Sequence, residues 1–221
     1  MKKIINKLMC AFTLIVLSSC GSVNIVDAWK ADNISEMRDS NILVIARTAN
    51  NTARIEFESE ITNQLKARGL NATASFSRFP KLNPDAKMTE ERKQLIRFIL
   101  DSEGYNGIVL TVLKDVRERT VTSYESGSYF GSPWDNYYPP YFGGFYSYYY
   151  RPYTYTYGMS IGSAPTTYTS KTYYLETVIY NLDAPENAQL VAVVTSKIED
   201  PKDIYKIASS YAEEIVKALE K

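Results

Sequence analysis

The sequence contains no histidine and only two cysteines, Cys10 and Cys20. Without an imidazole there is no base for a Ser–His or Cys–His catalytic site, and zinc sites made of cysteine and histidine are excluded as well. A phosphate-binding glycine loop is also missing, because Gly143-Gly144 lies among tyrosines with no lysine after it. We therefore expect a protein that is not an enzyme and that uses no metal or cofactor.

Long apolar runs are missing too, and a membrane-spanning helix needs about 20 apolar residues. The chain opens with three lysines, then a short apolar stretch from Leu8 to Leu17, and then Ser18-Ser19-Cys20. A cationic start, a short apolar region and small residues before a cysteine are typical of a bacterial lipoprotein signal. The sequence predicts a signal peptide at residues 1–19, whose removal leaves Cys20 as the lipid attachment site and membrane anchor.

The residue after the lipid-carrying cysteine bears on which membrane is used. An aspartate there resembles an inner-membrane retention signal, whereas this chain has Gly21, and no acidic cluster follows it. By analogy we expect the outer membrane, with the protein facing the periplasm. Because Cys10 leaves with the signal and Cys20 carries lipid, we expect neither a disulfide nor a free thiol.

Charge excludes nucleic acid as a partner. The full chain has 25 basic and 25 acidic side chains. Removal of residues 1–19 takes away three lysines and no acid, which leaves a net charge of −3. A nucleic-acid-binding domain is typically strongly basic, so we expect none here.

The rest of the chain alternates predicted strands and helices. Strands are expected at 42–46, 71–79, 107–121, 172–182 and 190–198. Helices are expected around the apolar stripe Phe57, Ile61 and Leu65, after Thr89 with the stripe Leu95, Ile96, Ile99 and Leu100, and after Asp200 as a cap with Pro201 at the first helical position. This order predicts an α/β (α+β) fold with a single mixed β-sheet of about five strands and helices packed on it.

These elements predict one domain after the signal. Residues 20–39 lack sustained periodicity and are expected to form a lipidated tether, with Trp29 docking on the body or on the bilayer interface. Residues 40–221 are expected to form a single α/β domain. Within it, residues 124–168 form a Tyr/Gly/Pro-rich insertion.

That insertion holds 13 of the 19 tyrosines, together with six glycines and five prolines, but only three charges and almost no aliphatic residue. A core needs interlocking aliphatic side chains, so the segment is not expected to be core. Three interpretations stay open: a flexible or hairpin-like insertion, a recognition surface of rigid amphipathic rings, or a belt at the membrane interface. The candidate partner-binding residues are Trp134, Tyr137, Tyr138, Tyr141, Tyr148, Tyr149 and Tyr150.

The chain resembles a Gram-negative, Bacteroidetes-like lipoprotein family catalogued as a domain of unknown function. The resemblance covers residues 20–221, although members often have a tryptophan where this chain has Leu190-Val191-Ala192. The layout is also similar to small α/β envelope-assembly domains, such as the N-terminal domain of TolB and the curli secretion lipoprotein. The resemblance implies a location and a fold but no catalytic residue. It rests on the lipobox at Cys20, Ile42-Leu43-Val44-Ile45, Leu65-Lys66-Ala67-Arg68-Gly69, Tyr105-Asn106-Gly107-Ile108-Val109-Leu110, the aromatic insertion, Leu175-Glu176-Thr177-Val178-Ile179-Tyr180 and the closing helix.

The functional expectation is a non-enzymatic, membrane-anchored lipoprotein of the cell envelope that binds an envelope protein or glycan in the periplasm. The alternative is a surface-displayed adhesin or glycan-binding lipoprotein that uses the tyrosine-rich segment. An enzyme is the weakest hypothesis and depends on the carboxylates Glu56, Glu58 and Glu60. A solvated helix face accounts for these three acids equally well.

Overall fold

The computed structural model describes residues 23–79, 86–87, 89–121, 144–150 and 168–220. The strands are β1 (Val23–Lys30), β2 (Asn41–Arg47), β3 (Asn71–Ala74), β4 (Gly107–Val121), β5 (Tyr168–Asn181) and β6 (Leu190–Glu199). The α-helices are α2 (Asn51–Ala67), α3 (Ser75–Arg78), α4 (Glu90–Ser102), α5 (Phe145–Tyr150) and α6 (Ile204–Glu220), and the 3-10 helices are η1 (Asp32–Asp39) and η3 (Glu186–Ala188).

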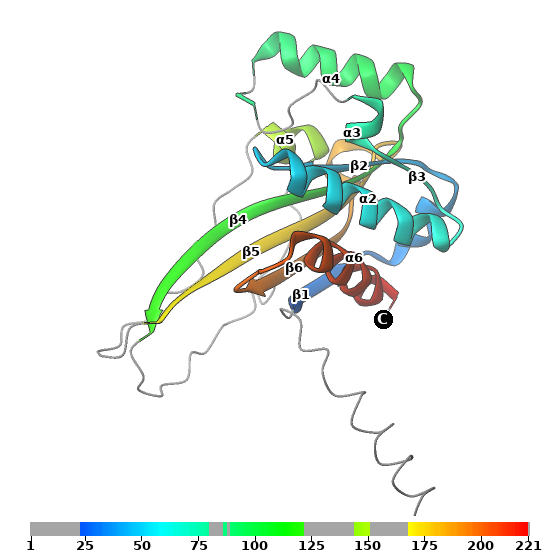
Figure 1. The fold of residues 1–221 in the computed structure, drawn as a ribbon. Coiled ribbons are helices and arrows are strands. Elements are labelled where there is room, and N and C mark those ends of the chain that lie inside the picture. The colour runs from blue at the N-terminus through cyan, green and yellow to red at the C-terminus, as the bar shows by residue number, and fades with distance from the viewer. Residues whose placement is uncertain (1–22, 80–85, 88, 122–143, 151–167, 221) are drawn as a thin grey trace, which may run out of the picture.

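The six strands form one mixed sheet in the order β1-β6-β5-β4-β2-β3 (Figure 1). Strand β2 pairs in parallel with β3 and β4, whereas the other neighbours are antiparallel. The predicted mixed sheet with packed helices is confirmed, with one strand more than expected.

Strand β2 explains why the sheet needs helices on both faces. Its side chains at Leu43 and Ile45 join one hydrophobic cluster, while Ile42 and Val44 join the other. A strand buried on both faces has no polar alternation, which is why its sequence is a continuous apolar run.

Helices α2 and α6 cover one face and pack against each other. The predicted stripe Phe57, Ile61 and Leu65 is buried on that face, and the ring of Phe57 lies 5.0 Å from that of Tyr211 on α6. The end of α2 also follows the prediction: Gly69 has a φ of +81°, and its N–H donates to the carbonyl of Lys66 at 2.9 Å. Only a residue tolerant of positive φ closes the helix in this way.

Helices α4 and α5 cover the opposite face. Thr89 caps α4 as predicted, accepting from the N–H of Arg92 at 3.3 Å. Of the predicted apolar stripe, Ile96 and Leu100 are buried, but Leu95 is 48% exposed. The prediction that Leu95 belongs to the buried stripe is therefore wrong.

The expected tether is wrong from Val23 onward. Residues 23–30 form the edge strand β1, paired antiparallel with β6 from Val23↔Ile198 to Lys30↔Ala192. The cause is tertiary: β6 needs a second neighbour for its backbone groups, and β1 supplies it although its own sequence lacks alternation. Trp29 packs against the hydrophobic cluster on the α5 side of the sheet. Of the two predicted docking sites, the body of the protein is therefore confirmed.

Two predicted boundaries also differ. The strand expected at 71–79 stops at Ala74 and turns into α3. The last helix begins at Ile204, so Asp200 and Pro201 are not its cap and first residue. Instead Asp203 Oδ1 accepts from the N–H groups of Tyr205 and Lys206 at 3.0 and 3.3 Å.

Strands β4 and β5 extend beyond the rest of the sheet. Pairing of β4 with β2 ends at Arg47↔Val112, whereas pairing with β5 continues to Val121↔Tyr168. A bulge between Leu113 and Asp115 bends this pair, and Figure 1 shows it as a long curved two-stranded arm.

Candidate functional site

The residues predicted for partner binding are only partly within the described chain. Trp134, Tyr137, Tyr138 and Tyr141 lie outside it, as does the predicted lipid site Cys20. Tyr148 and Tyr150 belong to α5, with side chains outside the description.

Tyr149 does not have the exposed ring that a partner-binding role requires, because its side chain is 2% exposed. Burial raises the pKa of its hydroxyl. Its neighbour Phe145 is fully buried, with its ring 5.5 Å from that of Tyr149 and 5.8 Å from that of Tyr180 on β5. The N–H of Phe145 donates to Gln189 Oε1 at 3.1 Å.

The tyrosine-rich segment therefore contributes to the core, contrary to the compositional expectation for 124–168. Phe145 and Tyr149 join a cluster that includes aliphatic side chains of β2, β4 and α4, and Phe145 also packs edge to face against Tyr180 of β5. The backbone carbonyl of Tyr149 also accepts from Arg47 Nη1 at 3.1 Å, which ties α5 to the end of β2.

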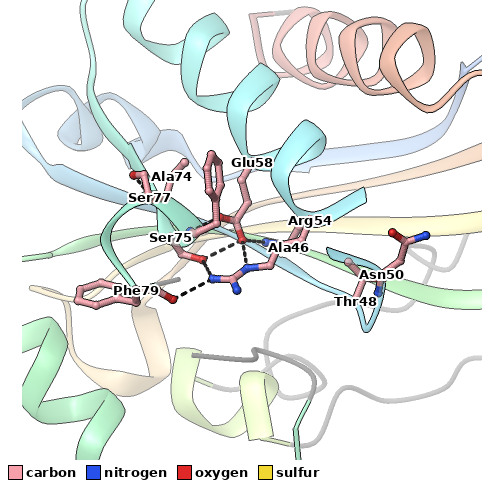
Figure 2. Close-up of polar contacts among 10 residues, drawn as sticks. Ala46, Thr48, Asn50, Arg54, Glu58, Ala74, Ser75, Ser77 and Phe79 are labelled. Atoms are coloured by element: carbon pink, nitrogen blue, oxygen red, sulfur yellow. Dashed lines mark hydrogen bonds and ion pairs between the residues drawn. The ribbon is translucent and has the colours of Figure 1, made fainter. Parts of the chain in front are cut away.

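A buried polar cluster, here called the Glu58 cluster, lies between α2, β2 and α3 (Figure 2). Glu58 Oε1 accepts from the N–H of Ala46 at 2.9 Å, from the Ser75 hydroxyl at 2.8 Å and from Arg54 Nε at 3.2 Å. Its Oε2 accepts from the N–H of Phe76 at 2.6 Å. Glu58 is 0% exposed and Arg54 4%.

The geometry assigns Glu58 a structural role rather than a catalytic one. Every near group donates to the carboxylate, and Arg54 Nη2 reaches on to Ser75 Oγ at 3.1 Å and the Phe79 carbonyl at 3.4 Å. Burial raises the pKa of Glu58, while the hydrogen bonds and Arg54 oppose that rise. The expectation that this acid lies on a solvated face is wrong; Glu56 and Glu60 are half-buried.

The best candidate for a binding site is a cavity of about 520 Å³ on the α2 and α6 face. Its floor is made by adjacent strands: Leu113 of β4 pairs with Leu175 of β5, and Tyr173 of β5 pairs with Ile198 of β6. Its walls come from the first turns of α2 and α6, which both begin at this end of the sheet. The wall residues include Ala53, Phe57, Ile204 and Ile207.

The polar side of this cavity, here called the α2/α6 cavity, has one exposed cation, Lys202, which lies ahead of α6. Arg47, Thr48 and Asn50 also line it at the end of β2, but the guanidinium of Arg47 is turned toward α5, where its Nη1 donates to the Tyr149 carbonyl. No acidic side chain is among its described lining residues. Sequence reasoning missed this site because its lining residues come from six separate elements. Only the length of the predicted 107–121 strand indicated that apolar residues would extend past the helices.

The described part of the chain contains neither a cluster of metal ligands nor a helix that could span a membrane. No group of three or more His, Cys, Asp or Glu side chains there could hold a metal ion. Within the same residues, no helix has both the length and the apolar character needed to cross a bilayer.

Comparison with known proteins yields similar structures but no family. No family model matches the chain, and no curated protein matches it. PelC from Paraburkholderia phytofirmans, solved as a dodecamer, is similar with 10% sequence identity and a TM-score of 0.41, over 90% of this chain and 96% of that chain.

Two further solved structures have similar statistics. Lipoprotein GNA1162 from Neisseria meningitidis has 8% identity and a TM-score of 0.38, over 82% of this chain and 98% of that one. A DUF4136 family protein from Bacteroides thetaiotaomicron has 10% identity and a TM-score of 0.34, over 92% and 94%. The similar structures thus include a bacterial lipoprotein and a member of a domain-of-unknown-function family. These values are too low to transfer a family, function or partner to this chain.

Proposed function

We propose that this protein is a non-enzymatic lipoprotein of the bacterial cell envelope, anchored through Cys20 and binding an envelope protein or glycan. It sits on the outer membrane and faces the periplasm. The absence of histidine and of a free thiol in the mature chain supports a binding role over catalysis.

The observation that carries the proposal is how soon the folded body begins after the anchor. Strand β1 starts at Val23, three residues after Cys20. Three residues span at most about 11 Å, so a lipid on Cys20 holds one end of the sheet against the bilayer. A short tether suits a protein that meets its partner at the membrane surface.

The binding role is supported by the aromatic residues of the tyrosine-rich segment that lie outside the described residues. Trp134, Tyr137, Tyr138 and Tyr141 remain candidates, since rings of this kind form interface hot spots. Two large exposed side chains lie outside that segment, Phe98 at 68% and Tyr205 at 61%, and they serve as a comparison.

The anchor is tested by Cys20→Ala. We expect the variant to leave washed membranes and appear as soluble periplasmic protein or as uncleaved precursor, whereas the unmodified protein stays in the membrane fraction. Several acyl chains hold a protein firmly, and the variant has none. A correctly cleaved variant recovered wholly in washed membranes would contradict the proposal.

The partner is tested by crosslinking in native cells followed by identification of what co-purifies. Replacing Trp134, Tyr137, Tyr138 and Tyr141 by serine should abolish the crosslinked partner. The matched control replaces Phe98 and Tyr205 by serine. An unchanged set of partners in the first variant would remove the tyrosine-rich segment from the binding surface. Protease treatment of intact cells distinguishes a periplasm-facing protein from the adhesin alternative, since only a surface-displayed protein is cut.

A further inference from the structure

We propose that the α2/α6 cavity binds an acyl chain of an anionic phospholipid from the membrane that holds the protein. The inference rests on the proposed anchoring at Cys20 for its supply of lipid. It assigns a ligand class to a site that neither the tyrosine-rich segment nor the Glu58 cluster uses.

The cavity has the size and the lining of a site for an apolar ligand. Its volume of about 520 Å³ falls within the roughly 300–1,000 Å³ of ordinary small-molecule sites. Leu113 is 47% exposed although it points to the same face as buried Leu175, its register partner. Burying apolar surface of this kind contributes about 25 cal/mol per Å², so an acyl chain against this floor is favoured.

The charge of the cavity favours an anionic headgroup. Lys202 is exposed and lines the cavity, whereas the guanidinium of Arg47 is turned toward α5. The two acids near Lys202 in sequence are engaged elsewhere: Asp203 accepts from backbone N–H groups of α6, and Asp200 accepts from the Lys171 N–H at 2.7 Å and from Ser170 Oγ at 2.9 Å. An exposed lysine at one end of an apolar cavity can pair with a phosphate attached to an acyl chain.

The position of the cavity places it near the bilayer. Ile198 in its floor pairs directly with Val23, and paired Cα atoms on antiparallel strands are about 4.5–5.5 Å apart. Adding the three residues back to Cys20 limits the Cα distance between Cys20 and Ile198 to about 16 Å. The cavity is therefore within reach of lipids around the anchor.

The test measures lipid binding without the anchor, so that it does not depend on lipidation. The mature chain carrying Cys20→Ala is mixed with phosphatidylglycerol or phosphatidylcholine, and adducts are counted by native mass spectrometry. We expect a one-to-one adduct with phosphatidylglycerol and at least about tenfold weaker binding of phosphatidylcholine, equivalent to about 1.4 kcal/mol.

Two cavity variants and two matched controls locate the lipid. Lys202→Glu and Leu113→Glu should each weaken phosphatidylglycerol binding by about tenfold or more. Lys66→Glu, an exposed lysine at the far end of α2, and Leu95→Glu, 48% exposed on the opposite face, should bind within about twofold of the parent. Lys202→Glu alters only an exposed side chain, so the variant is expected to fold. It therefore still tests lipid binding in the α2/α6 cavity if Leu113→Glu fails to fold.

Three outcomes would overturn the assignment: no one-to-one adduct, equal binding of both lipids, or unchanged binding by Lys202→Glu. Each leaves the anchor proposal intact, because that proposal depends on the membrane fractionation of the Cys20→Ala protein in cells. Fractionation of that variant with the membrane would instead contradict the proposed anchor. The assignment of a lipid to the cavity would then be tested by the binding measurements alone.

Discussion

At the scale of single residues, the Glu58 cluster is where one side chain holds three segments together. Glu58 accepts from the backbone of β2 at Ala46, from the start of α3 at Phe76, and from Arg54 on its own helix. Removing one partner of a buried ion pair leaves the other charge uncompensated.

We therefore expect Glu58→Ala to lower the free energy of unfolding by about 3–5 kcal/mol, measured by urea denaturation. Glu60→Ala, on the same helix and half-buried, is the control and should change it by less than about 0.5 kcal/mol. Equal effects of the two substitutions would show that the cluster contributes nothing specific.

A second residue-scale prediction concerns Tyr211, which is 0% exposed and whose hydroxyl lies 2.8 Å from Thr177 Oγ1. Burial raises the pKa of Tyr211 from 10.0 to about 12. Between these values the folded protein keeps a proton that the unfolded chain loses, so stability is full below pH 10 and falls as pH rises toward 12. Two pKa units correspond to a loss of about 2–3 kcal/mol.

Comparison with Tyr211→Phe isolates this effect from the other tyrosines. The variant should be less stable by about 1 kcal/mol at neutral pH because it loses a hydrogen bond. Its unfolding free energy should fall less steeply between pH 9 and 11.5 than that of the parent. Parallel curves over this range would contradict a raised pKa at Tyr211.

At the scale of elements, α5 shows how a short helix from a polar aromatic segment becomes part of the core. Phe145 is 0% exposed, and large-to-small changes at such sites cost about 3–5 kcal/mol. We expect Phe145→Ala to lower the unfolding free energy by that amount and to reduce the melting temperature. Tyr205→Ala removes a ring that is 61% exposed and should leave the melting curve nearly unchanged. An unchanged unfolding free energy of the Phe145→Ala variant would show that α5 does not contribute to the stability of the core.

At the scale of the whole molecule, the short connection between Cys20 and β1 fixes how close the body lies to the bilayer. A ten-residue Gly/Ser linker inserted after Ser22 has a root-mean-square length of about 17 Å. Because it lies outside the described elements, we expect unchanged thermal stability. Because it frees the body, we expect the floor of the α2/α6 cavity to move away from the headgroups.

The measurement uses a thiol label on Leu113→Cys, since the mature chain has no cysteine besides Cys20. Nitroxide-labelled headgroups should quench this label, and the linker should reduce the quenching. The control is a label on Phe98→Cys, on the α4 side of the sheet, where quenching should be weaker from the start. Equal quenching at 113 with and without the linker would contradict a body held at the membrane by its short tether.

How far the sequence predicts this fold depends on whether local cues agree with tertiary needs. The stripe of α2, its glycine end and the cap of α4 at Thr89 were predicted because the residues that form each feature lie within one or two turns of each other. The start of α6 was not: Asp200 and Pro201 form a plausible local cap, but Asp200 has a φ of 44° and its carboxylate is used by Ser170 and Lys171 of β5.

The candidate sites could likewise be predicted only where the residues that form them lie close together in the sequence. An acid at 58 between the apolar positions Phe57 and Ile61, four residues after Arg54, was a readable signal of a buried pair, yet its partners on β2 and α3 were not readable. The lining of the α2/α6 cavity comes from six elements, and no local pattern specifies that they meet.

The sequence by itself determined helices α2 and α4, the presence of α6, the buried parallel strand, the class of fold and the lack of histidine chemistry, because these depend on composition and on spacing within a few residues. Only the tertiary structure decided that residues 23–30 become an edge strand, that Phe145 and Tyr149 enter the core, and that Glu58 is buried. In each of these cases the deciding partner lies far away along the chain. Whether a strand edge is paired, a ring is buried or a carboxylate is buried depends on the residues that pack against it in the folded chain.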